Sequence, residues 1–283
     1  MTLISQELLE SDYSLFKEYL VSECGIVLGD NKQYLVRSRL LPLLRQFEID
    51  SYTNLISRVV KSRDSSLNNA VIDAMTTNET LWFRDGHPFE VLKADIFPKL
   101  QNKRTPVRIW CAACSSGQEP YSIAMSLLEY KTQNASAFSG GVEIIGTDIS
   151  NNMLDQCRRA TYDNLSLSRG LSNERLERFF EPAEVGAKNE SRQLKREVTR
   201  MVSFRSMNLF DSYAALGSFD LIFCRNVLIY FSIDGKKRIL QQIASSLQSG
   251  GTLFLGASES LSGISNDFDM NRSGQGIFYV KKQ

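Results

Sequence analysis

The sequence predicts an α/β protein in which a doubly wound parallel sheet follows an all-α amino-terminal unit. Up to about Thr77 the chain carries only helical patterns, whereas from Val107 onward strand and helix patterns alternate, as in parallel sheets covered on both faces. The 283 residues include 42% hydrophobic and 23% charged side chains, which is ordinary for a folded protein. That length allows one large domain with a smaller companion, or two modest domains.

The amino-terminal unit is predicted to contain four short helices. Ser11 or Asp12 can cap the first helix. A second helix is expected over residues 31–47, with Pro42 as a kink or a restart. Two more helices follow, and Ser66 is a suitable cap for the last of them.

The rest of the chain is predicted to form the sheet and its covering helices. The expected strands cover residues 107–113, 142–148, 202–208, 219–226, 251–257 and, at the edge of the sheet, 277–281. Helices are expected over residues 120–129 and 234–248. The polar connection 160–201 is unusually long, so we expect it to have structure or function of its own.

Composition excludes several classes of protein. Thirty-three basic and thirty-two acidic residues give a formal charge of +1, so no overall field would hold nucleic acid or an anionic membrane. No apolar stretch is long enough to span a membrane, and the amino terminus lacks the layout of a secretion signal. Five cysteines, an odd number, fit a reducing compartment. We therefore expect a cytoplasmic protein without membrane insertion, and nothing demands more than a monomer.

Cysteine and histidine content argues against a metal site. Cys111 and Cys114 have the spacing of redox or zinc motifs, but the chain has no second pair and only one histidine, His87. We expect a packing role for the two cysteines, no bound metal, and a loop or helix-start position for His87.

A basic segment lies within the helical unit. Seven basic residues against two acidic ones, Glu48 and Asp50, give it a local charge of +5. The basic residues are Lys32, Arg37, Arg39, Arg45, Arg58, Lys61 and Arg63. Such a run is either a solvated helix face or a docking surface for an acidic partner. The absence of interleaved aromatic residues argues against nucleic acid.

A ligand is expected beyond the carboxyl ends of the strands. After the first strand, residues 112–120 form a run of small side chains with one glycine, Gly117, and one acid, Glu119. A dinucleotide site would need a G-x-G-x-x-G loop, and Glu119 would repel a diphosphate. Small residues and a carboxylate suit a flat ligand with a cationic amino group, such as S-adenosylmethionine.

Three polar residues end the following strands. Asp148 can accept both hydroxyls of a ribose, or can cap the next helix, although Ser150 serves equally well as that cap. Asn208 and Asn226 offer amides that can read an adenine edge or the amino acid portion of the ligand. Asparagines are also common in turns at both places.

Four ordered motifs are spread along the chain. They are TTNETLWFRD at 76–85, CSSGQEPYS at 114–122, GTDI at 146–149 and CRNVLIYF at 224–231. Together they resemble the chemotaxis receptor methyltransferase family, CheR, and the resemblance covers nearly the whole chain. It implies a Rossmann-like S-adenosylmethionine-dependent methyltransferase fold. The implied domains are a helical receptor-docking domain over 1–77 and a catalytic domain over 78–283, with a small β subdomain inserted at about 160–201.

The resemblance also implies an activity and a site. Family members transfer a methyl group from S-adenosylmethionine to glutamate side chains of chemoreceptors, which gives methyl esters and S-adenosylhomocysteine. The residues that match the family's cofactor contacts are Asn78, Thr80, Arg84, Glu119, Asp148, Asn208, Leu209, Asn226 and Val227. Two departures from the family pattern, Trp82 and Gln118, are expected to alter the pocket rim and to remove a charge near the cofactor.

This chemistry requires few catalytic groups. A glutamate has a reference pKa of about 4.3, so it is ionised at neutral pH without a general base. The protein mainly aligns the two reactants. We predict that Arg84 steers the incoming carboxylate, although it can instead pair with Asp85. Tyr230 either lines the methyl channel or packs as a partly buried aromatic.

Two rival functions and one additional partner follow from the same residues. Base-methylating enzymes often have Asn-Pro-Pro-Tyr where this chain has NVLI at 226–229. A non-catalytic signalling module would keep the cofactor pocket without turnover. In some family members the inserted subdomain binds a receptor's carboxyl-terminal tail as an added strand. Here it carries Arg192, Lys195, Arg196, Arg200 and Arg205, opposed only by Glu197.

Overall fold

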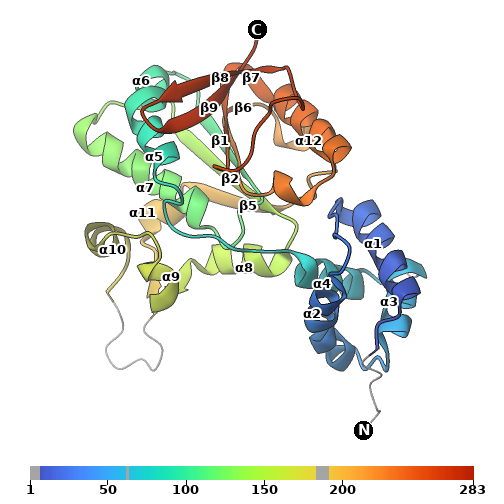
Figure 1. Ribbon diagram of the computed structural model, residues 1–283. Coiled ribbons are helices and arrows are strands. Elements are labelled where there is room, and N and C mark those ends of the chain that lie inside the picture. Colours follow the sequence, from blue (N-terminus) through green and yellow to red (C-terminus); the bar gives the residue numbers. More distant parts are fainter. Residues whose placement is uncertain (1–6, 62–63, 183–190) are drawn as a thin grey trace.

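The amino-terminal helices form a unit with its own core. In the computed structural model, which describes residues 7–61, 64–182 and 191–283, they lie to one side of the sheet (Figure 1). The four helices are α1 (Glu10–Cys24), α2 (Gln33–Gln46), α3 (Tyr52–Lys61) and α4 (Ser65–Met75). Tyr13, Phe16 and Leu40 are fully buried among them. This core is distinct from the two cores that cover the faces of the sheet.

Three expected helix features differ in the structure. Helix α1 begins at Glu10 with Leu9 as its N-cap, because Asp12 is used within the helix to accept a hydrogen bond from Thr53 Oγ1 at 2.6 Å. Asp64, rather than Ser66, caps α4 and accepts two backbone N–H groups. Pro42 lies inside α2, which continues through it.

Seven strands form the main sheet. They are β1 (Val107–Ala112), β2 (Val142–Asp148), β5 (Val202–Ser206), β6 (Phe219–Cys224), β7 (Leu247–Leu255), β8 (Phe268–Ser273) and β9 (Gly276–Lys281), in the spatial order β5-β2-β1-β6-β7-β9-β8. The first five are parallel to one another, as predicted. The predicted edge position of 277–281 is wrong, because β9 pairs antiparallel with both β7 and β8. Gly274, at φ 55°, allows the tight turn that folds β8 back as the true edge.

Both faces of the sheet are covered. Ile109 of β1 points into a core shared with α5 (His87–Val91), a π-helical segment (Leu92–Ile96), α6 (Phe97–Leu100), α7 (Gln118–Gln133) and α8 (Asn151–Arg159). The next residue, Trp110, points into a second core shared with α12 (Ile233–Ser246). Apolar residues on both sides of a strand are typical of a buried parallel sheet. The carboxyl ends of the strands consequently meet between these layers and the helical unit.

The long connection contains more helix than strand in its described part. β3 (Thr161–Asp163) and β4 (Ser191–Gln193) form a two-stranded antiparallel sheet beside α9 (Asn164–Ser168), α10 (Asn173–Phe179) and α11 (Arg196–Thr199). Trp82 packs edge-on against Tyr162 and Phe180 of this segment, with ring centroids 4.8 and 5.4 Å away. The expected place of Trp82 at the pocket rim is therefore wrong, because its ring is buried beneath the insertion.

The cysteines lie inside the fold, whereas His87 lies at the start of a helix. All five cysteines are free and buried, and the described residues contain no cluster of side chains that could hold a metal ion. His87 begins α5, 3.9 Å from the carboxylate of Glu90. Across the described ranges, no helix has the length and apolar character needed to cross a bilayer.

Candidate active site

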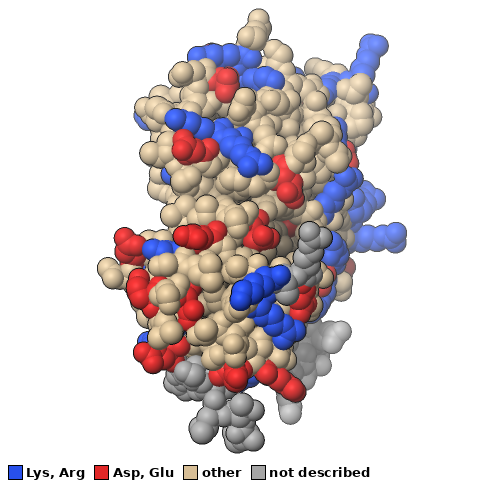
Figure 2. All heavy atoms as spheres, turned by 90° about the vertical axis from the view of Figure 1, so that its right-hand side faces the viewer, with Lys and Arg blue, Asp and Glu red and all other residues tan. Residues whose placement is uncertain are grey.

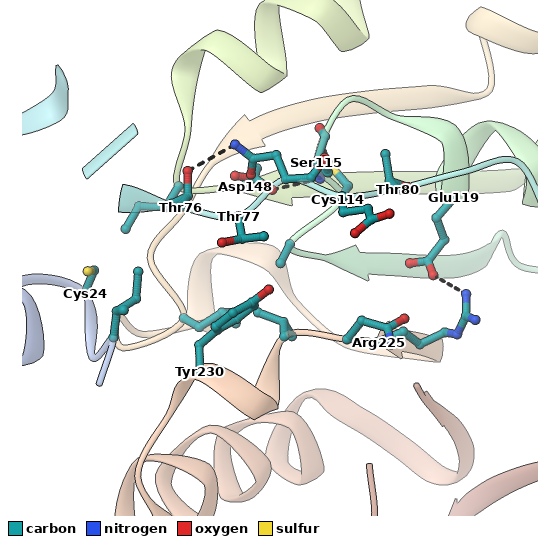
Figure 3. Close-up of a pocket in the computed structure, with 18 of the residues that line it drawn as sticks. Cys24, Thr76, Thr77, Thr80, Cys114, Ser115, Glu119, Asp148, Arg225 and Tyr230 are labelled. Atoms are coloured by element: carbon teal, nitrogen blue, oxygen red, sulfur yellow. Dashed lines mark hydrogen bonds and ion pairs between the residues drawn. The ribbon is translucent and has the colours of Figure 1, made fainter. Parts of the chain in front are cut away.

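One cleft gathers all ten residues that the sequence singled out for the site (Figure 3). It lies at the carboxyl ends of the parallel strands and has about 990 Å³ of empty space, open solvent at its mouth included. Small ligands typically bind at this place in α/β sheets. The ten residues are Asn78, Thr80, Arg84, Glu119, Asp148, Asn208, Leu209, Asn226, Val227 and Tyr230. Their contacts with a cofactor remain a prediction.

The floor of the cleft is the loop between β1 and α7. Ala113, Ser115 and Gly117 have positive φ angles of 56°, 50° and 96°, so the backbone alternates in direction through this short run. Small side chains lower the steric cost of that conformation and let a flat ligand approach the backbone. The Ser115 hydroxyl donates to the Asn78 carbonyl oxygen at 3.0 Å, which joins the floor to the segment before α5.

Asp148 ends β2 and is almost fully buried. Its Oδ2 accepts the Ser115 N–H at 2.8 Å and its Oδ1 accepts the Ser150 N–H at 2.9 Å. Burial raises the pKa of Asp148, although these hydrogen bonds oppose the shift. Ser150, rather than Asp148, caps α8 by accepting the Met153 N–H. Each carboxylate oxygen therefore keeps an acceptor position for a ligand hydroxyl.

A buried ion-pair group forms the opposite end of the cleft. Arg225 Nη1 donates to Glu119 Oε2 at 2.8 Å, and its Nη2 donates to Asp85 Oδ2 at 2.6 Å. Burial raises the pKa of Glu119, and the charge of Arg225 opposes that rise. Gln118 is buried and lies outside the lining of the cleft, and Glu119 is the neighbouring residue that lines it.

Arg84 does not pair with Asp85, which was the alternative to its role in steering the substrate. Asp85 pairs with Arg225, and Arg84 Nη1 donates only to the Glu79 carbonyl oxygen, at 2.9 Å. Within the ranges that the structure describes, no carboxylate lies at ion-pair distance from Arg84. Arg84 thus forms no ion pair with the described residues at the cleft, although its charge acts on Glu119 and opposes the rise in the pKa of that carboxyl.

The helical unit supplies one wall of the cleft. Cys24, Ile26 and residues 75–77 line it together with the strand ends. Asn208 Nδ2 donates to the Glu23 carbonyl oxygen at 2.6 Å, and the Val27 N–H donates to the Tyr230 carbonyl oxygen at 2.9 Å. Sequence patterns gave no indication of these cross-domain contacts, since the partners are far apart in the chain.

The sequence did not predict the roles of two residues that hold the cleft in shape. Glu259 accepts backbone N–H groups from Asn226, Leu228 and Gly256 at 2.7 to 2.8 Å, which fixes the loop that carries Asn226 and Tyr230. Arg39, predicted as part of a docking surface, instead donates to the carbonyl oxygens of Met75 and Thr76 at 2.7 and 2.9 Å. It holds a segment that lines the cleft.

The residues present fit S-adenosylmethionine. That ligand has a ribose, a cationic amino acid end and no phosphate. Asp148 offers acceptor positions for the ribose, and Glu119 offers a carboxylate for the amino group. A parallel sheet with this acidic, small-residue cleft at its carboxyl edge is the arrangement of an S-adenosylmethionine-dependent methyltransferase.

Comparison with known proteins identifies the family. Residues 78–277 match the family model described as "CheR methyltransferase, SAM binding domain", and residues 11–76 match "CheR methyltransferase, all-alpha domain". The chain therefore belongs to the CheR methyltransferase family, and its cofactor is S-adenosylmethionine.

Relatives agree over nearly the full length. "Chemotaxis protein methyltransferase" of Vibrio anguillarum is 53% identical over 96% of this chain and 98% of its own. "Chemotaxis protein methyltransferase Cher2" of Pseudomonas putida is 49% identical over the same shares. The enzyme of Salmonella typhimurium is 32% identical over 94% of this chain and 88% of its own.

Proposed function

We propose that this methyltransferase acts on glutamate side chains of chemotaxis receptors and forms glutamate methyl esters and S-adenosylhomocysteine. The observation that carries the proposal is Arg84, a cation without a carboxylate partner in the described chain, on the cleft that fits the methyl donor. A guanidinium there suits an incoming carboxylate, since it can donate two parallel hydrogen bonds.

The side chains of the cleft have separate roles in this proposal. When bound, S-adenosylmethionine supplies a methyl group that its own sulfonium activates. Asp148 accepts the ribose hydroxyls, and Glu119 accepts the amino group of the methionine part. Arg84 aligns the substrate carboxylate, and Tyr230 narrows the path between donor and acceptor. No general base is required, because a glutamate is already ionised at neutral pH.

The receptor partner is proposed to meet the helical unit, residues 1–77. Lys32, just before α2, and Arg37, Arg45 and Lys61 on the helices are exposed and suit acidic receptor helices. Arg39 and Arg58 are engaged within the unit, and Arg63 lies outside the described residues. Basic and acidic side chains are mixed on the face seen in Figure 2, so the attraction would be local.

The inserted segment and the cellular setting complete the proposal. The basic residues of the inserted segment suit an acidic receptor tail, which would add as a strand beside β3 and β4. One of them, Lys195, already donates hydrogen bonds to backbone carbonyl oxygens at the end of α10. We propose a monomer that works in the cytoplasm, where receptor signalling domains are reached without entering the membrane.

Transfer of labelled methyl groups tests the reaction class. Purified protein is mixed with labelled S-adenosylmethionine and receptor-containing membranes, and the product is treated with mild alkali. Release of volatile methanol is expected, because methyl esters hydrolyse whereas N-methyl groups persist. Alkali-stable label would contradict the glutamate assignment, and tight cofactor binding without any transfer would favour the non-catalytic alternative.

A further inference from the structure

Arg225 is a buried cation that contacts two separate segments at one end of the cleft. Only 2% of its side chain is exposed. On one side it donates to Glu119, which lies in the first turn of α7 (Figure 3). On the other side its Nη2 donates to the Arg84 carbonyl oxygen at 2.9 Å as well as to Asp85. A single guanidinium therefore joins the cofactor side of the cleft to the turn that carries Arg84.

That turn has an unfavourable backbone. Phe83, Asp85 and Gly86 have φ angles of 49°, 69° and 63°, and a bulky residue such as Phe83 rarely adopts the left-handed region. Such conformations persist at functional sites only where surrounding contacts fix them. Ser122 Oγ accepts a hydrogen bond from the Phe83 N–H at 3.1 Å. Arg225 Nη2 donates to the Arg84 carbonyl oxygen and to the Asp85 carboxylate.

We propose that Arg225 is a positioning residue that couples the two halves of the site: it orients Glu119 toward the cofactor and holds the turn that aims Arg84 at the substrate. The inference rests on the proposed role of Arg84. It predicts that the link to the turn can be broken separately from the link to Glu119, because the two links use different nitrogens of one guanidinium.

Asp85→Asn breaks the ionic link to the turn and leaves Glu119 paired. With receptor-containing membranes, kcat is expected to fall about 10-fold or more, because Arg84 is no longer held in alignment. Cofactor affinity, measured by calorimetry, is expected to stay within about 2-fold. An unchanged kcat, or an equal loss in cofactor affinity, would overturn the proposal.

Arg225→Lys keeps a cation beside Glu119 but replaces the fork with a single flexible ammonium. It is expected to lower kcat by about 10- to 100-fold. Combining it with Asp85→Asn should reduce kcat by no more than about 3-fold further, because both changes remove the same link. Losses that multiply would show that the two residues act independently and would overturn the coupling.

Arg108→Lys is the matched control. This half-buried arginine pairs with Glu143 at 2.7 Å near the amino end of β1, away from the cleft. It should leave kcat and cofactor affinity unchanged.

Hydrogen exchange separates this inference from the proposed function, because it needs no receptor. Backbone amides of residues 83–87 should exchange faster in Asp85→Asn and Arg225→Lys but not in Arg108→Lys. If the wild-type protein formed no methyl ester, that pattern would still support Arg225 as the residue that holds the turn. Unchanged exchange in both variants would overturn it.

Discussion

At the scale of single residues, buried acids make the site sensitive to pH. Burial raises the pKa of both Glu119 and Asp148, so the folded protein retains protons that an unfolded chain would release. Between the ordinary and the raised pKa values, the free energy of unfolding therefore decreases as pH rises, because the folded protein must release these protons from buried carboxyl groups. A cationic cofactor favours the ionised carboxylates and works in the opposite direction.

Cofactor affinity should consequently decrease as pH falls through the raised pKa values. Calorimetry from about pH 7.5 to about pH 5 tests this, and binding should release protons over the same range. Glu119→Gln should bind more weakly at neutral pH and show a flatter pH profile. An unchanged profile in that variant would assign the pH dependence to other groups.

Glu259 is a second residue whose effect can be separated from catalysis. Its carboxylate accepts three backbone N–H groups, and Glu259→Gln places an amide group among those donors. Each unsatisfied donor costs about 1–3 kcal/mol. We expect a lower melting temperature and a loss of cofactor affinity of about 10-fold, since Asn226 and Tyr230 lie on the loop. Glu18→Gln, on the exposed face of α1, should change neither quantity.

At the scale of elements, Arg39 links α2 to the end of α4. Its hydrogen bonds satisfy carbonyl oxygens that a helix end leaves free, and they hold Thr76 and Thr77 in the cleft wall. Arg39→Met should lower the free energy of unfolding by about 1–3 kcal/mol and weaken cofactor binding. Urea denaturation and calorimetry measure the two effects.

Arg37, two residues away, provides the contrast. Its side chain is exposed on α2 and no hydrogen bond or ion pair of that side chain is recorded among the described residues. Arg37→Glu should leave stability and cofactor affinity unchanged but reduce methylation of receptors, because the new carboxylate would repel the acidic receptor helices at the proposed docking surface. Equal losses in all three measurements would contradict a docking role.

The strands also show which parts of the fold could be predicted from the sequence. β2 was predicted with its observed bounds, because a run of buried residues that ends at Asp148 defines it locally. The position of β9 inside the sheet depended on its pairing with β7, and β8 shows a mostly exposed pattern that predicts no strand. Local motifs likewise contain eight of the ten predicted residues, all but Asn208 and Leu209. Glu259 and Arg39 instead act on segments more than 30 residues away in sequence.

At the scale of the whole molecule, the cleft depends on how the helical unit sits against the sheet. Gly25 ends α1 at φ 74°, and a Cβ built there would lie 2.0 Å from the ring of Phe210. Gly25→Ala should therefore push the two units apart, lower the melting temperature and weaken cofactor binding.

Gly29→Ala is the matched control for that substitution, because a Cβ at Gly29 meets nothing within 4 Å. It should preserve both the melting temperature and cofactor affinity. If Gly25→Ala also preserved them, the contact between the two units would not contribute to the cleft.

The five buried cysteines allow local unfolding of this protein to be measured at separate places. Cys24 lies in the helical unit, whereas Cys111, Cys114, Cys157 and Cys224 lie within or beside the sheet. A thiol reagent can reach each group only when the surrounding structure opens, so labelling rates report local unfolding at two separate places. Cys24 and Cys114 both line the cleft, from the helical unit and from the strand ends respectively, so their labelling rates would report separation of the two units, while the other three would report opening of the sheet.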